Sequence, residues 1–122
     1  MNERVNVYVA SPYAAIRCSD DIRRHLAKKI ALDECTRIMN AGFTPISPVL
    51  RLEGKFDEKT QRDEALKAGL EMLKQCDYYY ESTHLDTANS QGVKSEREFA
   101  KANDIPKMVL NKDGQAEICL WL

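Results

Sequence analysis

The chain has 122 residues, which suits one domain with one hydrophobic core, so we expect residues 1–122 to form a single domain. Its 18 basic and 19 acidic residues give a net charge of -1, which excludes the basic footprint of a nucleic-acid-binding protein. The four cysteines form no CxxC pair and no cluster has metal-ligand spacing, so we expect neither a metal nor a cofactor. The N-terminus does not resemble a signal peptide, and no apolar run approaches the ~20 residues that span a bilayer. We therefore expect a cytoplasmic protein with no membrane partner.

Strand-like and helix-like segments alternate along the first half of the chain. Residues 5–10 (VNVYVA) are β-branched and aromatic and predict a first strand. Apolar positions from residue 20 to about 40 recur at helical spacing, with Ser19 as a candidate N-cap and "NAG" at 40–42 as a candidate stop. Residues 43–49 predict a short second strand, whose prolines suit the edge of a sheet.

The second half continues this alternation. A long polar loop over 51–64 leads into a helix from about 60 to 75, and residues 77–82 predict a third strand whose middle tyrosine faces away from its neighbours. A turn-rich loop then precedes a helix from about 93 to 103. Two further strands are expected at 105–110 and 116–122, and the short turn between them allows an antiparallel hairpin.

This order of elements predicts an α/β fold. We expect a three-layer sandwich of the flavodoxin or Rossmann type, with a parallel sheet of four to five strands, helices on both faces and a last strand that can run antiparallel. Ligands of such sheets bind beyond the carboxyl ends of the strands. The segments expected at that edge are SPYA (11–14), SPV (47–49), ESTHLD (81–86) and the loop that enters the third long helix.

The stretch SQGVKSEREFA, residues 90–100, runs from this loop into the helix. Ser90, Gly92 and the N–H groups of the helix start could hold a phosphate or another anion, with Asn89 beside them, although an ordinary helix cap explains the same residues. Glu96 would lie about one turn into the helix and point back over the loop, where a carboxylate can act as nucleophile or base at the anomeric carbon of a sugar. The alternative is an acidic residue favoured by the helix dipole, and Glu98 suits that alternative as a surface charge.

The other segments at this edge offer further candidates. Ser11 could donate to a ligand oxygen, and Tyr13 could stack on a base or donate its hydroxyl. Pro12, next to Ser11, is a further candidate for ligand contact, although Ser-Pro is also a common way to leave a strand. His84 lies in the loop after the third strand and is a weaker candidate for ligand contact.

Four segments in this order, ASPY, AGFTPISP, CDYYY and SQGVKSEREFAKANDIPKMV, resemble the nucleoside 2-deoxyribosyltransferase-like superfamily, especially its small bacterial and phage members. The resemblance spans about residues 5–110, and the last segment is similar to the 2'-deoxynucleoside 5'-phosphate N-hydrolase branch, which carries S-x-G-V-x-x-E. It implies an enzyme that cleaves the N-glycosidic bond of a nucleoside or nucleoside 5'-monophosphate, as a hydrolase or a transferase. It also implies a homo-oligomer.

The resemblance assigns roles to individual positions. Glu96 matches the nucleophile that attacks C1' and forms a glycosyl-enzyme intermediate. Ser90 and Gly92 match the loop that holds the 5'-phosphate, and Ser11 matches a serine of the same branch. Tyr13 falls where the family places an aromatic or basic residue near the ligand, and Ser47 matches a small polar position after the second strand.

One position departs from the family pattern. The family commonly keeps an aspartate eight residues before the aspartate that opens the third strand, to protonate the leaving base, and counting back from Asp77 reaches Gly69. His84, Asp86 or a glutamate of the 52–58 loop could replace this acid. Otherwise the chain would be a non-catalytic protein that binds or sequesters a nucleotide-like ligand, or a structural domain with a vestigial site.

Overall fold

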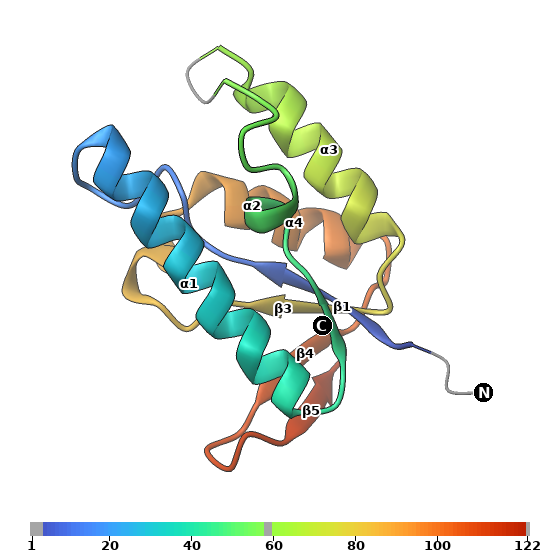
Figure 1. The fold of residues 1–122 in the computed structure, drawn as a ribbon. Helices are drawn as coiled ribbons and strands as arrows, with labels where there is room; N and C mark the ends of the chain where they lie inside the picture. Colours follow the sequence, from blue (N-terminus) through green and yellow to red (C-terminus); the bar gives the residue numbers. More distant parts are fainter. Residues whose placement is uncertain (1–3, 58–59, 122) are drawn as a thin grey trace.

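The computed structural model of the chain describes residues 4–57 and 60–121. Within these residues, five strands form one sheet in the order β2-β1-β3-β4-β5 (Figure 1). The strands are β1 (Asn6–Ala10), β2 (Thr44–Ile46), β3 (Tyr78–Glu81), β4 (Lys107–Leu110) and β5 (Ala116–Cys119). The pairs β1–β2, β1–β3 and β3–β4 are parallel, and β4–β5 is antiparallel. The predicted sheet, its edge strand β2 and its terminal hairpin are therefore confirmed.

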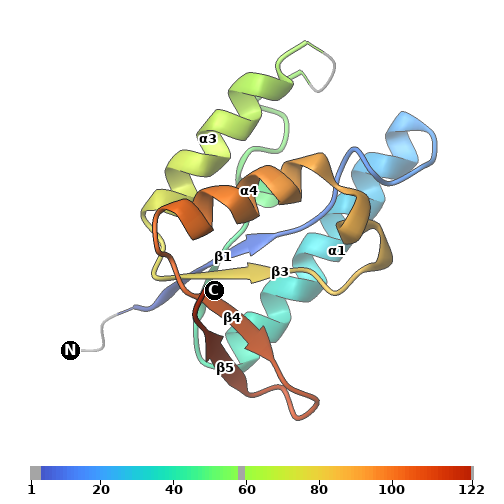
Figure 2. The same cartoon turned by 180° about the vertical axis from the view of Figure 1, so that it is seen from behind.

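Helices lie on both faces of this sheet, which confirms the predicted three-layer arrangement. The helices are α1 (Asp20–Asn40), α2 (Pro48–Arg51), α3 (Arg62–Lys74) and α4 (Gln91–Ala102), with a 3-10 helix η1 (Leu85–Asn89) after β3. The long helix α1 crosses one face of the sheet, and α3 and α4 lie side by side on the other, as the two opposite views show (Figures 1 and 2).

The central strand β1 separates two hydrophobic cores because its side chains alternate between the two faces. Val7 and Val9 point toward α1 and pack with Ile38, whereas Tyr8 points toward α3 and α4 and packs with Leu73. Val7, Val9 and Tyr8 are all completely buried.

The neighbouring strand β3 follows the same alternation. Tyr79 lies in the core of Tyr8, whereas Tyr78 and Tyr80 lie on the α1 side, as the sequence predicted for the middle tyrosine. Because parallel pairing aligns Tyr8 with Tyr79, the two rings stack on the face that α3 and α4 cover.

Several boundaries differ from the sequence prediction, including the start of β4 and the end of β5, and at three places a serine or histidine side chain accepts a hydrogen bond at the difference. The second strand ends early because Ser47 caps α2, its Oγ accepting from the N–H of Leu50 at 3.3 Å. The helix α4 begins two residues early because Ser90 Oγ accepts from the N–H of Val93 at 3.2 Å. The loop after β3 contains η1, at whose start His84 Nδ1 accepts from the N–H of Asp86 at 3.2 Å.

Over the two described ranges, none of the helices combines the length and apolar character needed to cross a bilayer.

Candidate active site

A pocket of about 580 Å³ lies beside the carboxyl end of β1 and the first turns of α4. Side chains from the end of β1 and the segment after it, from the start of α1, from α2 and from α3 and α4 form its walls. This volume is within the range of small-molecule sites, and the position is where ligands bind to parallel α/β sheets. The predicted residues brought together here are Ser11, Tyr13, Ser90, Gly92 and Glu96.

Glu96 is a buried carboxyl group on the inner face of α4. It follows Val93 by three residues and precedes Ala100 by four, so the three side chains share the helix face that packs on the sheet, and Glu96 is only 6% exposed. Its Oε2 accepts a hydrogen bond from the hydroxyl of Tyr8. Burial raises the pKa of Glu96 to about 8, opposed by the Tyr8 hydrogen bond and reinforced by the charge of Glu81. The structure therefore holds a carboxyl group that is mostly protonated at neutral pH and ionises just above it.

The ring of Tyr8 is held in place by Tyr79, which is in turn bonded to a charged pair. Its ring stacks on Tyr79 with the ring centroids 6.2 Å apart and the planes 15° from parallel. The Tyr79 hydroxyl donates to Glu81 Oε1 at 2.9 Å, and Glu81 forms an ion pair with Arg97. Burial, followed by the Glu96 charge, raises the pKa of Tyr8 well above 10, so its hydroxyl stays protonated and serves as a hydrogen-bond donor.

The N-terminal end of α4 gives the pocket an anion-binding end. The N–H groups of Gln91 and Gly92 are the first two of the helix, and such groups have no acceptor within a helix. Ser11 lines the same pocket as Gly92, is 6% exposed, and has an Oγ that is buried without a hydrogen-bond partner among the described residues. Since a buried hydroxyl is rarely left unpaired, Ser11 and the helix start are suited to a negatively charged ligand group.

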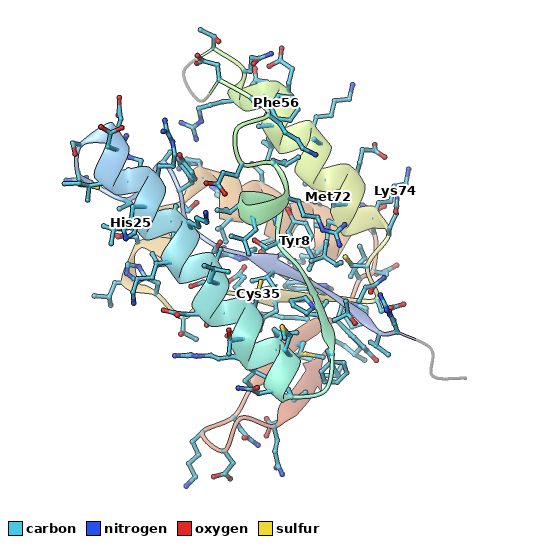
Figure 3. All side chains as sticks on the ribbon, in the orientation of Figure 1. Tyr8, His25, Cys35, Phe56, Met72 and Lys74 are labelled. Atoms are coloured by element: carbon cyan, nitrogen blue, oxygen red, sulfur yellow. The ribbon has the colours of Figure 1, made fainter. Side chains whose placement is uncertain are left out.

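Part of the pocket lining is apolar. It comes from α2 and the segment after it and from α3, and consists of Val49, Leu52, Phe56, Ala65 and Leu66, with Arg62 of α3 also in the lining. Figure 3 shows Phe56 in the connection between α2 and α3, away from Tyr8 on the sheet. This apolar slot suits a heterocyclic base.

Gly69 brings α3 close to the Tyr8–Glu96 pair. A Cβ at this position would lie 3.1 Å from the Tyr8 hydroxyl oxygen and 3.5 Å from Pro48 Cβ. The hydroxyl of Tyr8 therefore fills the space that a side chain at position 69 would enter. The pocket wall beside Glu96 consists of backbone at this point.

Charged side chains surround the mouth of the pocket. Arg23 pairs with Asp20 at 2.7 Å and also donates to the carbonyls of Ile16 and Cys18, which fixes the segment between β1 and α1. Arg62, the first residue of α3, is exposed and also lines the pocket. A second hollow of about 640 Å³ adjoins the mouth, where Lys28 and Glu53 pair at 3.4 Å.

Four predicted site residues lie outside the lining of this pocket. Pro12 is completely buried beside Ser11, and Ser47 is buried as the cap of α2. Asp86 and Asn89 lie in η1, where Asp86 contacts His84 and Asn89 is exposed.

The side chains considered as replacements for the missing acid also lie elsewhere. His84 and Asp86 pair with each other at η1, at a distance of 3.7 Å, and neither lines the pocket. Glu53 lines the adjoining hollow instead. Glu58 lies outside the described residues.

The sequence prediction missed Tyr8, Arg23, Arg62 and the apolar wall. Tyr8 had a usable signal, because a hydroxyl in the middle of a buried strand needs a partner and strand alternation places it on the face of Tyr79. That the partner is Glu96, 88 residues away, follows only from the packing of α4 on the sheet.

A second buried carboxylate shows by contrast what is particular to Glu96. Glu34 on α1 is 3% exposed, and its oxygens accept from the N–H of Thr83 at 2.7 Å and the hydroxyl of Tyr80 at 3.3 Å. Glu34 lies on the far face of the sheet and fixes the loop after β3. Of these two buried glutamates, Glu96 lines the pocket and Glu34 does not.

The fold and this pocket define an α/β protein of the Rossmann-like type with a buried carboxyl group at the carboxyl edge of its sheet. Residues 5–110, which run from β1 to β4, match the family described as Domain of unknown function (DUF7768), and the chain belongs to that family. Comparison with curated proteins finds none that matches the chain. Across the part of the chain that the structure describes, no group of three or more His, Cys, Asp or Glu side chains has an arrangement suited to a metal ion.

Proposed function

We propose that the protein cleaves the N-glycosidic bond of a nucleoside or nucleoside 5'-monophosphate, as a hydrolase or a transferase, with Glu96 as the nucleophile. The observation that carries the proposal is the position of Glu96. It is buried, bonded to Tyr8, and lies in a pocket that also holds the start of α4 and the unpartnered hydroxyl of Ser11. This arrangement combines a buried carboxyl group with an anion-binding end and an apolar slot.

We propose one orientation for a bound nucleotide. The 5'-phosphate would bind at the N–H groups of Gln91 and Gly92 and at Ser11. Gly92 and Glu96 are four residues apart, about 6 Å along the helix axis, so a sugar held by its phosphate would reach Glu96 with C1'. The base would then enter the apolar slot beside Phe56.

In the reaction, the ionised Glu96 would attack C1' while the base leaves, and the Tyr8 hydroxyl would hold the carboxylate in the attacking geometry. Water or an acceptor base would then attack the same carbon and release Glu96. The hydrolase and the transferase share the first step and differ only in the second acceptor.

Incubation with nucleosides and their 5'-monophosphates, with and without an acceptor base, tests this function. Chromatography of the free base is expected to show release by the wild type and a loss of at least 1,000-fold in Glu96→Gln, since a nucleophile cannot be replaced by an amide. Glu98→Gln is the matched control, because Glu98 is exposed on the same helix and should leave the rate unchanged. Full activity in Glu96→Gln would contradict the proposal.

One observation favours a second candidate, a protein that binds a nucleotide-like ligand without cleaving it. The wall beside Glu96 offers Gly69 where the resemblance leads us to expect an acid. This candidate predicts micromolar or tighter binding in calorimetry and recovery of the ligand intact. Release of free base over time would exclude it.

We also propose that the chain forms a homo-oligomer, as the resemblance implies. Leu85 and Leu120 are 89% and 78% exposed, which leaves apolar surface for contacts between copies. Light scattering should give a mass at least twice that of one chain, and the mass of a single chain would contradict this.

A further inference from the structure

Among the described residues, the apolar slot offers a departing base no acid. Its side chains are apolar, and Gly69 presents only backbone where α3 approaches the reacting carboxyl group. Among the residues that the structure describes, Asp20 is the one carboxyl group besides Glu96 in the pocket lining, and it is paired with Arg23 at the mouth.

The hydroxyl groups of the pocket are poor substitutes for an acid. The Tyr8 hydroxyl donates a hydrogen bond to Glu96, and burial raises the pKa of Tyr8 well above 10, so Tyr8 is a poor acid for a leaving base. Tyr13 lines the mouth, and a phenol there is a far weaker acid than a carboxyl group. From the described residues of the pocket lining, the leaving group therefore receives no proton.

This condition selects a class of substrate. A purine or pyrimidine that leaves without a proton leaves as an anion, which is why general acids typically accelerate such reactions by 10²–10⁴-fold. A ring nitrogen that carries a positive charge in the glycoside, as in a pyridinium nucleotide, takes the electron pair of the broken bond and leaves as a neutral molecule. Such a substrate needs no acid.

A cationic ring also suits the state of Glu96. The carboxyl group is buried and bonded to a tyrosine hydroxyl, and it is mostly protonated at neutral pH because its pKa is about 8. A positive charge a few ångströms away favours the ionised form of a carboxyl group. A pyridinium ring in the slot would thus generate the nucleophile on binding, whereas a neutral base would not.

We propose that the substrate class of this site is the N-glycosyl pyridinium nucleotide, a substrate whose leaving group is a neutral pyridine. The inference rests on the proposed function of Glu96. In the first step a Glu96 carboxylate oxygen bonds to C1' as the C1'–N bond breaks. The electron pair of the broken C1'–N bond goes to the ring nitrogen. Water then attacks C1', the ester bond to Glu96 breaks, and one proton is released to solvent.

The test compares nicotinamide mononucleotide with AMP, dAMP, CMP and dCMP on the purified full chain at equal concentrations. Chromatography of the free base is expected to show a kcat/KM for the pyridinium nucleotide about 100-fold or more above the others. Glu96→Gln should abolish this release, and Glu98→Gln should retain it. Faster cleavage of a purine or pyrimidine nucleotide would overturn this inference and leave the proposed function standing. Cleavage of none of the five would overturn both.

A pair of variants at position 69 tests the reason for the preference. Gly69→Asp adds an acid, and Gly69→Ala controls for the Cβ that would crowd the Tyr8 hydroxyl. Relative to Gly69→Ala, Gly69→Asp is expected to increase cleavage of the purine nucleotides at least tenfold and to change pyridinium cleavage less than threefold. An equal increase for both substrates would contradict the argument. The wild-type comparison decides the proposal if either variant fails to fold.

Discussion

The substitution Glu96→Gln has a consequence for stability that does not depend on any substrate. Folding raises the pKa of Glu96 from 4.5 to about 8, so the folded chain keeps a proton that the unfolded chain loses between these two values. The wild type is therefore stabilised by this group below pH 4.5, and that contribution is lost as pH rises toward 8. A glutamine has no such dependence, because it does not ionise.

The size of the effect follows from the two pKa values. At about 1.4 kcal/mol for each pH unit between them, the free energy of unfolding of Glu96→Gln relative to wild type should increase by on the order of 4 kcal/mol between pH 5 and pH 9. Urea unfolding at the two pH values measures this, with Glu98→Gln as the exposed control on the same helix. An equal difference between wild type and Glu96→Gln at both pH values would refute the burial and protonation that we assign to Glu96.

Three further predictions concern the neighbours of Glu96. Tyr8→Phe removes a hydrogen bond that lowers the pKa of Glu96, so the midpoint of the rise in kcat/KM with pH should move upward by about one unit, and an unchanged or lower midpoint would contradict this. Ser11→Ala removes an unpartnered hydroxyl, so the free energy of unfolding should change by less than about 1 kcal/mol. The same variant should bind a 5'-monophosphate about fivefold more weakly in calorimetry. Unchanged affinity would exclude Ser11 from the anion-binding end. Gly69→Ala gains helix propensity of up to about 1 kcal/mol but crowds the Tyr8 hydroxyl, so its urea midpoint should stay near that of wild type, and a gain of more than about 1 kcal/mol would show that the wall is not tight.

The layer order of the fold could be predicted because strand-like and helix-like patterns alternate along the chain. The alternating pattern of residues 5–10 and the helical pattern of 20–40 correspond to β1 and α1. Boundaries were less predictable, because single serine hydroxyls move them. Ser47 converts the end of the expected second strand into α2, and Ser90 starts α4 at Gln91.

The candidate site was predictable where topology alone fixes position. Ser11, Ser90 and Gly92 follow strands or open a helix at the carboxyl edge, so the general rule for parallel sheets brings them together with Glu96. The rule carries no information on contacts between distant segments. The partner of Glu96 and the closeness of Gly69 to Tyr8 depend on how α3 and α4 pack, and periodicity does not encode that packing.

The covalent step at Glu96 is the central claim, and the most direct test is to capture its product. Wild type that is turning over a cleaved nucleotide is quenched in acid, digested and analysed by mass spectrometry. The account predicts a glycosyl phosphate attached to the peptide that contains Glu96, absent from Glu96→Gln and present in Glu98→Gln. The claim would be contradicted if the wild type released base but carried the adduct on another residue. It would also be contradicted if base were released and no adduct formed under conditions in which hydrolysis of the adduct limits the rate.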